Sequence, residues 1–110
     1  MVDVKISSGV GNYATGVVPM MPNGGGHANV TSNAVGVFYS TLANASCRQV
    51  TVANNSNTTV EVRQDGIDFG FPVFVQTYYT FYGLQYVSQL AIRRTDQSNT
   101  QVVINYRYEG

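Results

Sequence analysis

The sequence is poor in several residue types that stabilise or charge a small protein. It has no tryptophan, one cysteine (Cys47) and one histidine (His27) among 110 residues. A disulfide within the chain is therefore excluded, and a structural zinc site, which needs four Cys/His ligands, has too few. Only 11% of the residues are charged, against about 25% in ordinary soluble domains. Six basic and six acidic residues balance to a net charge of zero, which favours self-association.

Long apolar runs and a secretory pattern are missing as well. No apolar stretch approaches the ~20 residues of a membrane-spanning helix, and the amino terminus lacks a charged segment followed by an apolar one. A neutral surface gives little electrostatic drive toward nucleic acid or acidic membranes. The single unpaired Cys47 is typical of a reducing compartment. We therefore expect a protein made in the cytoplasm, with neither nucleic acid nor membrane as a partner.

What the chain does contain divides it into two unlike segments. Residues 1–34 are rich in glycine, include Pro19 and Pro22, and contain the run 23–26 (NGGG). Such a composition cannot build a core of its own. We predict an extended Gly/Pro-rich arm over residues 1–34, with the glycines as a swivel, and one β-sandwich domain over residues 35–110.

Apolar and polar residues alternate through the second segment at the period of two that marks a half-buried strand. Pro72 indicates an edge position for one of these strands. The Asn-rich residues 54–57 and the polar residues 95–99 predict hairpins between the strands that flank them. No helical period is present, so the fold class is all-β, a small antiparallel β-sandwich or jelly roll. The predicted strands are residues 34–43, 48–53, 59–64, 71–76, 90–94 and 101–108.

Residues that could perform catalysis are scarce. Cys47 and His27 are the only candidates for a thiol nucleophile and its base. His27 adjoins the glycine run, a poor scaffold for an imidazole, and Cys47 is better explained as a small apolar residue at the start of a strand. Residues 65–70 (DGIDFG) lack the ligands of a calcium loop, and residues 24–26 lack the lysine of a phosphate loop. We expect no enzyme activity, metal or cofactor.

The strongest functional signal is a cluster of aromatic residues. We predict that they fill the core and an interface between subunits, where tyrosine is enriched. The alternative is a sugar-binding platform, for which Gln76 and Gln85 are the only nearby amides. The aromatic candidates are Tyr78, Tyr79, Phe81, Tyr82 and Tyr86.

Two further groups are candidates for an interface. In the arm, Val17, Val18, Met20 and Met21 form a proline-bounded apolar run in which the methionines are adaptable contacts. Arg93 and Arg94 are adjacent in a strand and point to opposite faces, so they form no basic patch. We expect at least one of them to pair locally, with Asp96 nearby, or across a subunit boundary.

Size also favours association. Without the arm, roughly 75 residues remain, and a domain of this size buries only about 60–65% of the surface of its unfolded chain. Small domains without disulfides or metals are often stabilised by a partner subunit. The chain is therefore expected to form a homo-oligomer or to attach to a larger assembly.

Three segments resemble small virion proteins of tailed bacteriophages, above all head decoration (cement) proteins. They are residues 47–54 (CRQVTVAN), 60–64 (VEVRQ) and 89–102 (QLAIRRTDQSNTQV), which follow the arm and its glycine swivel. The resemblance extends over roughly residues 20–108. It implies a β-rich homotrimer on the capsid surface that binds the major capsid protein, and it brings no catalytic residues.

Three functions remain open from the sequence. The first is a non-enzymatic decoration protein that stabilises the shell by bridging capsid subunits, its arm reaching across a neighbour. The second is a structural protein elsewhere in the virion, namely a tail, fibre or head–tail connector subunit. The third, from a different class, is a carbohydrate-binding β-sandwich module that uses the aromatic residues.

Overall fold

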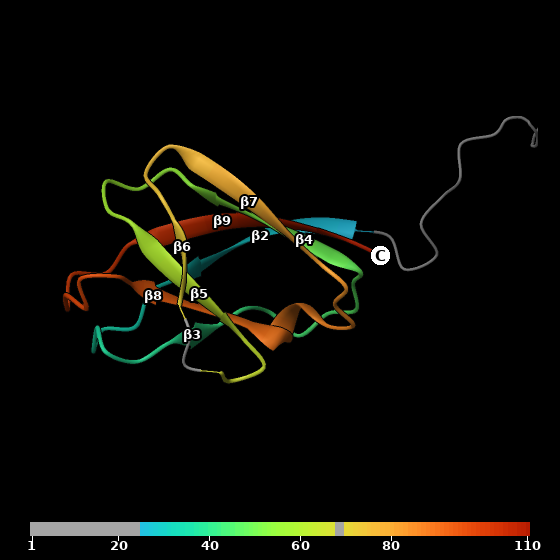
Figure 1. The fold of residues 1–110 in the computed structure, drawn as a ribbon, viewed down its shortest axis with the longest axis horizontal. Helices are drawn as coiled ribbons and strands as arrows, with labels where there is room; N and C mark the ends of the chain where they lie inside the picture. Colours follow the sequence, from blue (N-terminus) through green and yellow to red (C-terminus); the bar gives the residue numbers. More distant parts are fainter. Residues whose placement is uncertain (1–24, 68–69) are drawn as a thin grey trace, which may run out of the picture.

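The computed structural model describes residues 25–67 and 70–110, which form two four-stranded antiparallel sheets packed face to face (Figure 1). The first sheet has the order β2 (Gly25–Thr31), β9 (Val103–Glu109), β4 (Gln49–Asn54), β7 (Thr77–Tyr82). The second sheet has the order β3 (Ser40–Thr41), β8 (Leu90–Arg94), β5 (Val60–Gln64), β6 (Phe71–Val73). A short 3-10 turn, η1 (Val87–Gln89), precedes β8. The predicted all-β sandwich is confirmed.

The strand order makes this sandwich a jelly roll. β5 pairs with β6, β4 with β7, β3 with β8 and β2 with β9, each time antiparallel. The described chain is thus one long hairpin whose tip is the β5–β6 connection. Rolling this hairpin into two sheets brings β4 beside β9 and β5 beside β8.

The rolled topology shows that two predicted hairpins are wrong. β4 and β5 belong to different sheets, and so do β8 and β9. Residues 55–59 and 95–102 therefore cross from one sheet to the other instead of turning back within a sheet. β5 and β6 do pair directly with each other, and β6, which contains Pro72, lies at an edge as predicted.

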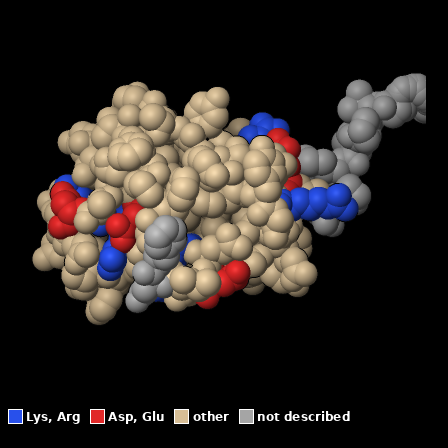
Figure 2. Space-filling view, in the orientation of Figure 1, with Lys and Arg blue, Asp and Glu red and all other residues tan. Residues whose placement is uncertain are grey.

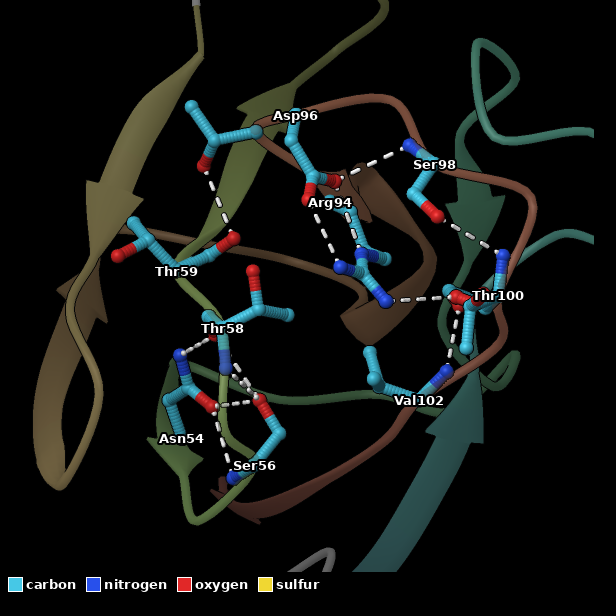
Figure 3. A network of polar contacts seen from close by, with 11 residues as sticks. Asn54, Ser56, Thr58, Thr59, Arg94, Asp96, Ser98, Thr100 and Val102 are labelled. Atoms are coloured by element: carbon cyan, nitrogen blue, oxygen red, sulfur yellow. Dashed lines mark hydrogen bonds and ion pairs between the residues drawn. The ribbon is translucent and has the colours of Figure 1, made fainter.

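A buried asparagine holds the first of these crossings (Figure 3). Asn54, the last residue of β4, has no exposed surface, and its side-chain amide donates to the carbonyls of Thr58 and Val73, each at 2.8 Å. Its Oδ1 accepts from the amide and the hydroxyl of Ser56 at 3.0 and 2.6 Å. Since Val73 lies in β6, this one side chain joins the two sheets.

The core lies between the sheets and follows the predicted alternation. Val50 and Val52 of β4 face Val60 and Val62 of β5 across the interior, and all four are at most 2% exposed. Fully burying a side chain of this size contributes about 1.5–3 kcal/mol. The same core also contains Leu90, Ile92, Ile104, Val73, Val87 and Tyr106.

The predicted boundary at residue 34 is wrong, because β2 is part of the first sheet. Its inward residues, Gly26, Ala28 and Val30, alternate with exposed ones. A Cβ at Gly26 would lie 2.6 Å from the hydroxyl oxygen of Tyr108, so a side chain at this position would have to displace the Tyr108 ring. Of the predicted arm, residues 1–24 lie outside the described part of the chain.

The predicted strand over residues 34–43 is also wrong except for β3. Asn33 Oδ1 accepts from the Val35 amide at 2.8 Å and starts a turn. Gly36 then packs against the backbone carbonyls of Gln97 and Ser98, where a Cβ would clash, and its amide donates to Asn99 Oδ1 at 2.9 Å. The loop is thus shaped by contacts with residues 97–99 that local alternation does not encode.

Candidate interaction surface

The tyrosine-dense segment forms β7, one of the two edge strands of the first sheet (Figure 1). Its alternation divides the aromatic residues between two faces. Tyr79 and Phe81 lie opposite Val52 and Val50 of β4 and therefore share the inward face, whereas Tyr78 and Tyr82 point outward. Two left-handed residues, Gln76 (φ 62°) and Gly83 (φ 74°), flank the strand.

The prediction that these aromatic residues fill the core is wrong for most of them. Tyr78 and Tyr82 are 74% and 71% exposed, and Tyr86 and Tyr79 are 50% and 45% exposed. The reason is topological, since β7 has a neighbour on one side only and no second layer covers the outer face of its sheet among the described residues. The other half of that prediction, an interface between subunits, remains a prediction.

The inward aromatics of β7 close the open side of the sandwich against β6. The Phe71 ring lies 4.4 Å from that of Tyr79 and 5.7 Å from that of Phe81, centroid to centroid, and Tyr79 and Phe81 are 4.9 Å apart. Beside them lies an apolar pocket of about 330 Å³. Its lining is completed by Val62, Gln64, Asp65 and Ile67.

The segment that contains β6 and β7 contributes no charged side chain to this side of the molecule. From residue 69 to residue 92 the sequence contains no Asp, Glu, Lys or Arg. Figure 2 shows charged side chains at the two ends and the lower rim of the visible face, and none over the broad upper region. Phe74 (60% exposed) and Val75 (38%), in the turn before β7, extend the apolar surface. Exposed apolar surface of this kind marks an interaction site.

A second feature is a shallow hollow on the outer face of the first sheet. Its volume is about 530 Å³ and its floor contains the small residues Thr51 and Ala53 of β4. β7 is the next strand beyond β4 on this face, where Ala53 lies opposite Tyr78 and Thr51 lies opposite Thr80, with the two threonine hydroxyls 2.8 Å apart. His27, Asn29, Asn105 and Arg107 line the other side. The sequence did not reveal these amides, because β2 and β9 are brought beside β4 only by the rolled topology.

The two adjacent arginines both pair within the described chain. Arg94 binds Asp96 through two contacts of 2.9 and 2.7 Å (Figure 3), which confirms the predicted local pair. This guanidinium, together with the Ser98 amide, holds the pKa of Asp96 below its ordinary value. Val17, Val18, Met20 and Met21, the other interface candidates, lie outside the described residues.

Arg93 belongs to a cluster on the second sheet that also contains Glu61, Arg63 and Tyr39. Its Nε lies 2.7 Å from Glu61 Oε2, directly across from it on β5, and the same oxygen accepts from the Tyr39 hydroxyl at 2.7 Å. The guanidiniums of Arg63 and Arg93 lie 4.2 and 4.4 Å from the centre of the Tyr39 ring. The cluster fastens the loop before β3 to the second sheet, a structural task.

Replacing Glu61 by glutamine is expected to lower the free energy of unfolding by about 1–2 kcal/mol, because two short bonds lose their charged acceptor in a site that is 13% exposed. Glu109→Gln is the matched control. Its pair with Arg107 is more exposed, 35% and 53%, and should contribute less than about 1 kcal/mol. Urea denaturation of both variants measures the difference, and equal losses would contradict the assignment.

Cys47 and His27 do not form a catalytic pair. Cys47 is 5% exposed and packs in the core, as predicted, and burial raises the pKa of its thiol. His27 lies on β2 at the hollow, on the outer face of the first sheet. Among the described residues no three His, Cys, Asp or Glu side chains gather as metal ligands.

The buried thiol leads to a simple prediction. At pH 8, Cys47 in the folded chain should react with a thiol reagent at least ten times more slowly than in urea, because only the exposed thiolate is nucleophilic. Above the ordinary thiol pKa, ionisation in the unfolded chain should also lower stability as pH rises. A time course of absorbance with a chromogenic disulfide checks the first point, and equal rates in both states would contradict the burial of Cys47.

No family model, no curated protein and no solved structure matches this chain. In the part of the chain that the structure describes, no helix has the length and apolar character to cross a membrane.

Proposed function

We propose that the chain is a non-enzymatic structural protein of a phage virion, a decoration (cement) protein that associates with itself and bridges major capsid protein subunits. The observation that carries the proposal is the uncharged stretch from residue 69 to residue 92, which presents Tyr78, Tyr82, Phe74 and Val75 at the surface. The place on a phage head comes from the resemblance described above.

The fold is compatible with this role. Eight-stranded jelly rolls are recurrent in viral capsid and lectin domains, although a fold alone does not determine a function. More specific support comes from the surface. A surface segment that is rich in tyrosine and contains no charged residue can be buried in a contact without leaving an unpaired charge, which is costly.

Co-sedimentation tests the proposal. Labelled chain is mixed with shells assembled from the major capsid protein of the same genome and then centrifuged. We expect saturable pelleting of the chain with shells and a rise in the temperature at which the shells break. A variant lacking residues 1–24 keeps β2 and the whole described sandwich, and it should pellet more weakly if the arm reaches a neighbour. Pelleting with tails or fibres instead of shells would favour a tail or fibre subunit. Pelleting with none of these particles would contradict the proposal.

The hollow on the first sheet favours a second candidate, carbohydrate binding. The exposed residues Tyr78 and Tyr82 lie on the same face of the first sheet as the amides of Gln49, Asn105 and Asn29, with Gln49 directly opposite Tyr82. A site with an apolar platform and a few fixed polar groups suits a small polar ligand. Screening the chain on a glycan array tests this function. The candidate requires binding that is lost on Asn105→Ala and kept on Phe38→Ala, a change in an exposed residue outside the hollow.

A further inference from the structure

The four edges of the two sheets differ in how well they are protected against pairing with another chain. Edge strands in soluble proteins are short, charged, interrupted by proline or bulged. β3 has two residues, and β6 has three and contains Pro72. β2 begins with two glycines, which weaken a strand. β7 has six residues (TYYTFY) with no proline, glycine or charge, and its register with β4 runs without a bulge from Thr77 to Tyr82.

The outer edge of β7 is also unoccupied within the described part of the chain. No backbone hydrogen bond links residues 78–82 to any described residue other than those of β4. The strand ends at the left-handed residues Gln76 and Gly83, so its flat edge is limited to this segment. A row of amides and carbonyls of this length is a template for an added strand.

We propose that two copies of this chain pair through their β7 strands, antiparallel, about a two-fold axis at Thr80, which joins the two first sheets into one eight-stranded sheet. The inference rests on the self-association in the proposed function and names its site. Such a contact is self-complementary and closes at two copies, so the oligomer is a dimer in place of the trimer that the resemblance implies.

The register follows from the sequence of the strand. Residues directly opposite in an antiparallel pair share a face, so inward residues must meet inward residues if the outer faces are to be continuous. Centred on Thr80, the pair sets Tyr78 against the partner's Tyr82 and Tyr79 against the partner's Phe81.

Neighbouring registers lack this match. Centred on Tyr79, the pair sets Tyr78 against threonine, and centred on Phe81 it sets Tyr79 against glycine. Only the Thr80 register opposes every aromatic residue of β7 with another. It also extends the Phe71–Tyr79–Phe81 cluster of each copy across the axis.

The area available sets the strength of the contact. A buried tyrosine contributes roughly 150–250 Å², and with Tyr78, Tyr79 and Tyr82 exposed by 74%, 45% and 71%, the pair buries at most roughly 800 Å² of aromatic surface. Stable interfaces bury about 1,200–2,000 Å². We therefore expect a dimer that dissociates in the micromolar range and is reinforced when several copies sit on one surface.

Engineered cysteines test the register. Opposite residues have Cα atoms about 4.5–5.5 Å apart, within the range of a disulfide, whereas position 78 and its own copy would be separated by about 13 Å along the strands. Under mild oxidation we expect disulfide-linked dimers from Thr80→Cys and from the double variant Tyr78→Cys with Tyr82→Cys. Tyr78→Cys alone and the unmodified chain, in which Cys47 is buried, should stay unlinked.

Each result bears on the inference. Because Thr80→Cys removes the bond to the Thr51 hydroxyl, the double variant tests the same register with Thr80 intact. Linking of Tyr78→Cys alone to the same extent, or no linking of either expected variant above the unmodified chain, would overturn the proposed pairing.

Variants with exchanged charges distinguish loss of the contact from loss of folding. Lysine at both positions 78 and 82 sets like charges opposite each other, as does glutamate at both positions, so neither variant should pair with itself. An equimolar mixture of the two variants should pair. A tagged copy of one variant should capture at least ten times more of the other variant than of its own untagged form. Val103→Lys, on β9 and 51% exposed, should leave pairing unchanged. Absence of recovery in the mixture would overturn the inference.

The proposed function and the β7 pairing can be contradicted independently of each other. Pairing through β7 in a chain that does not pellet with shells would support this inference and contradict the shell-binding role. Pelleting with shells by a chain that shows none of the expected cross-links would do the reverse.

Discussion

Replacing Asn54 by alanine is expected to lower the free energy of unfolding by about 2–4 kcal/mol. The Asn54 side chain is fully buried and makes four hydrogen bonds, to the carbonyls of Thr58 and Val73 and to the amide and hydroxyl of Ser56. Alanine removes all four at once. The loss leaves polar groups without partners at the point where the chain crosses between the sheets, and each such group costs about 1–3 kcal/mol.

Urea denaturation followed by circular dichroism measures this change as a shift of the midpoint at constant slope. Asn55→Ala is the matched control, since the neighbouring Asn55 is exposed, and it should change stability by less than about 0.5 kcal/mol. If the two variants lose the same free energy, the crossing does not depend on Asn54.

Replacing Ile104 by alanine is expected to cost about 2–5 kcal/mol. Ile104 has no exposed surface and lies on β9, between β2 and β4, opposite Val30. Truncation removes apolar contact and leaves a cavity that strands held on both sides cannot close. Small domains are stable by only about 5–15 kcal/mol, so a large share of the total is lost.

Thermal and urea unfolding of Ile104→Ala and Val103→Ala give the test. Val103 is adjacent in the same strand but 51% exposed, so its truncation should cost less than about 1 kcal/mol. A small loss at Ile104 would contradict the placement of the core between the two sheets.

Ile104 and Asn54 show which parts of the fold can be predicted from local sequence. The inward position of Ile104, like that of Val60 and Val62, follows from alternation at a period of two, and the structure confirms it. The pairing of the strands does not follow from it. The turn at Asn54 was predicted as a hairpin, but its amide bonds to Val73, nineteen residues away, and this long-range contact directs the chain into the other sheet.

The glycines illustrate the same limit. Gly26 was predicted to be part of a swivel, whereas in the structure it lies in a strand with the end of the Tyr108 side chain packed against it. Whether a glycine serves flexibility or close packing depends on a residue that is remote in the sequence. The amino-terminal limit of the domain was therefore placed too late.

The candidate surface was predicted in part. The density of tyrosine marked residues 78–82, and alternation divides them between two faces. Nothing in the local sequence indicates that β7 lies at the edge of its sheet. Tyr78 and Tyr82 are exposed because of this position and because no described residues form a layer over the outer face. The hollow beside them was missed for a related reason, since its side chains come from β2, β4 and β9.

The uncharged edge of β7 is the proposed contact between copies of the chain. The mass of the full chain in solution, measured by light scattering across a concentration series, tests it most directly. We predict a rise from the monomer mass of 12.0 kDa toward twice that value as the concentration passes through the micromolar range, and no rise for the variant with lysine at positions 78 and 82. A mass that stays at 12.0 kDa throughout, or that rises equally in both chains, would contradict the claim.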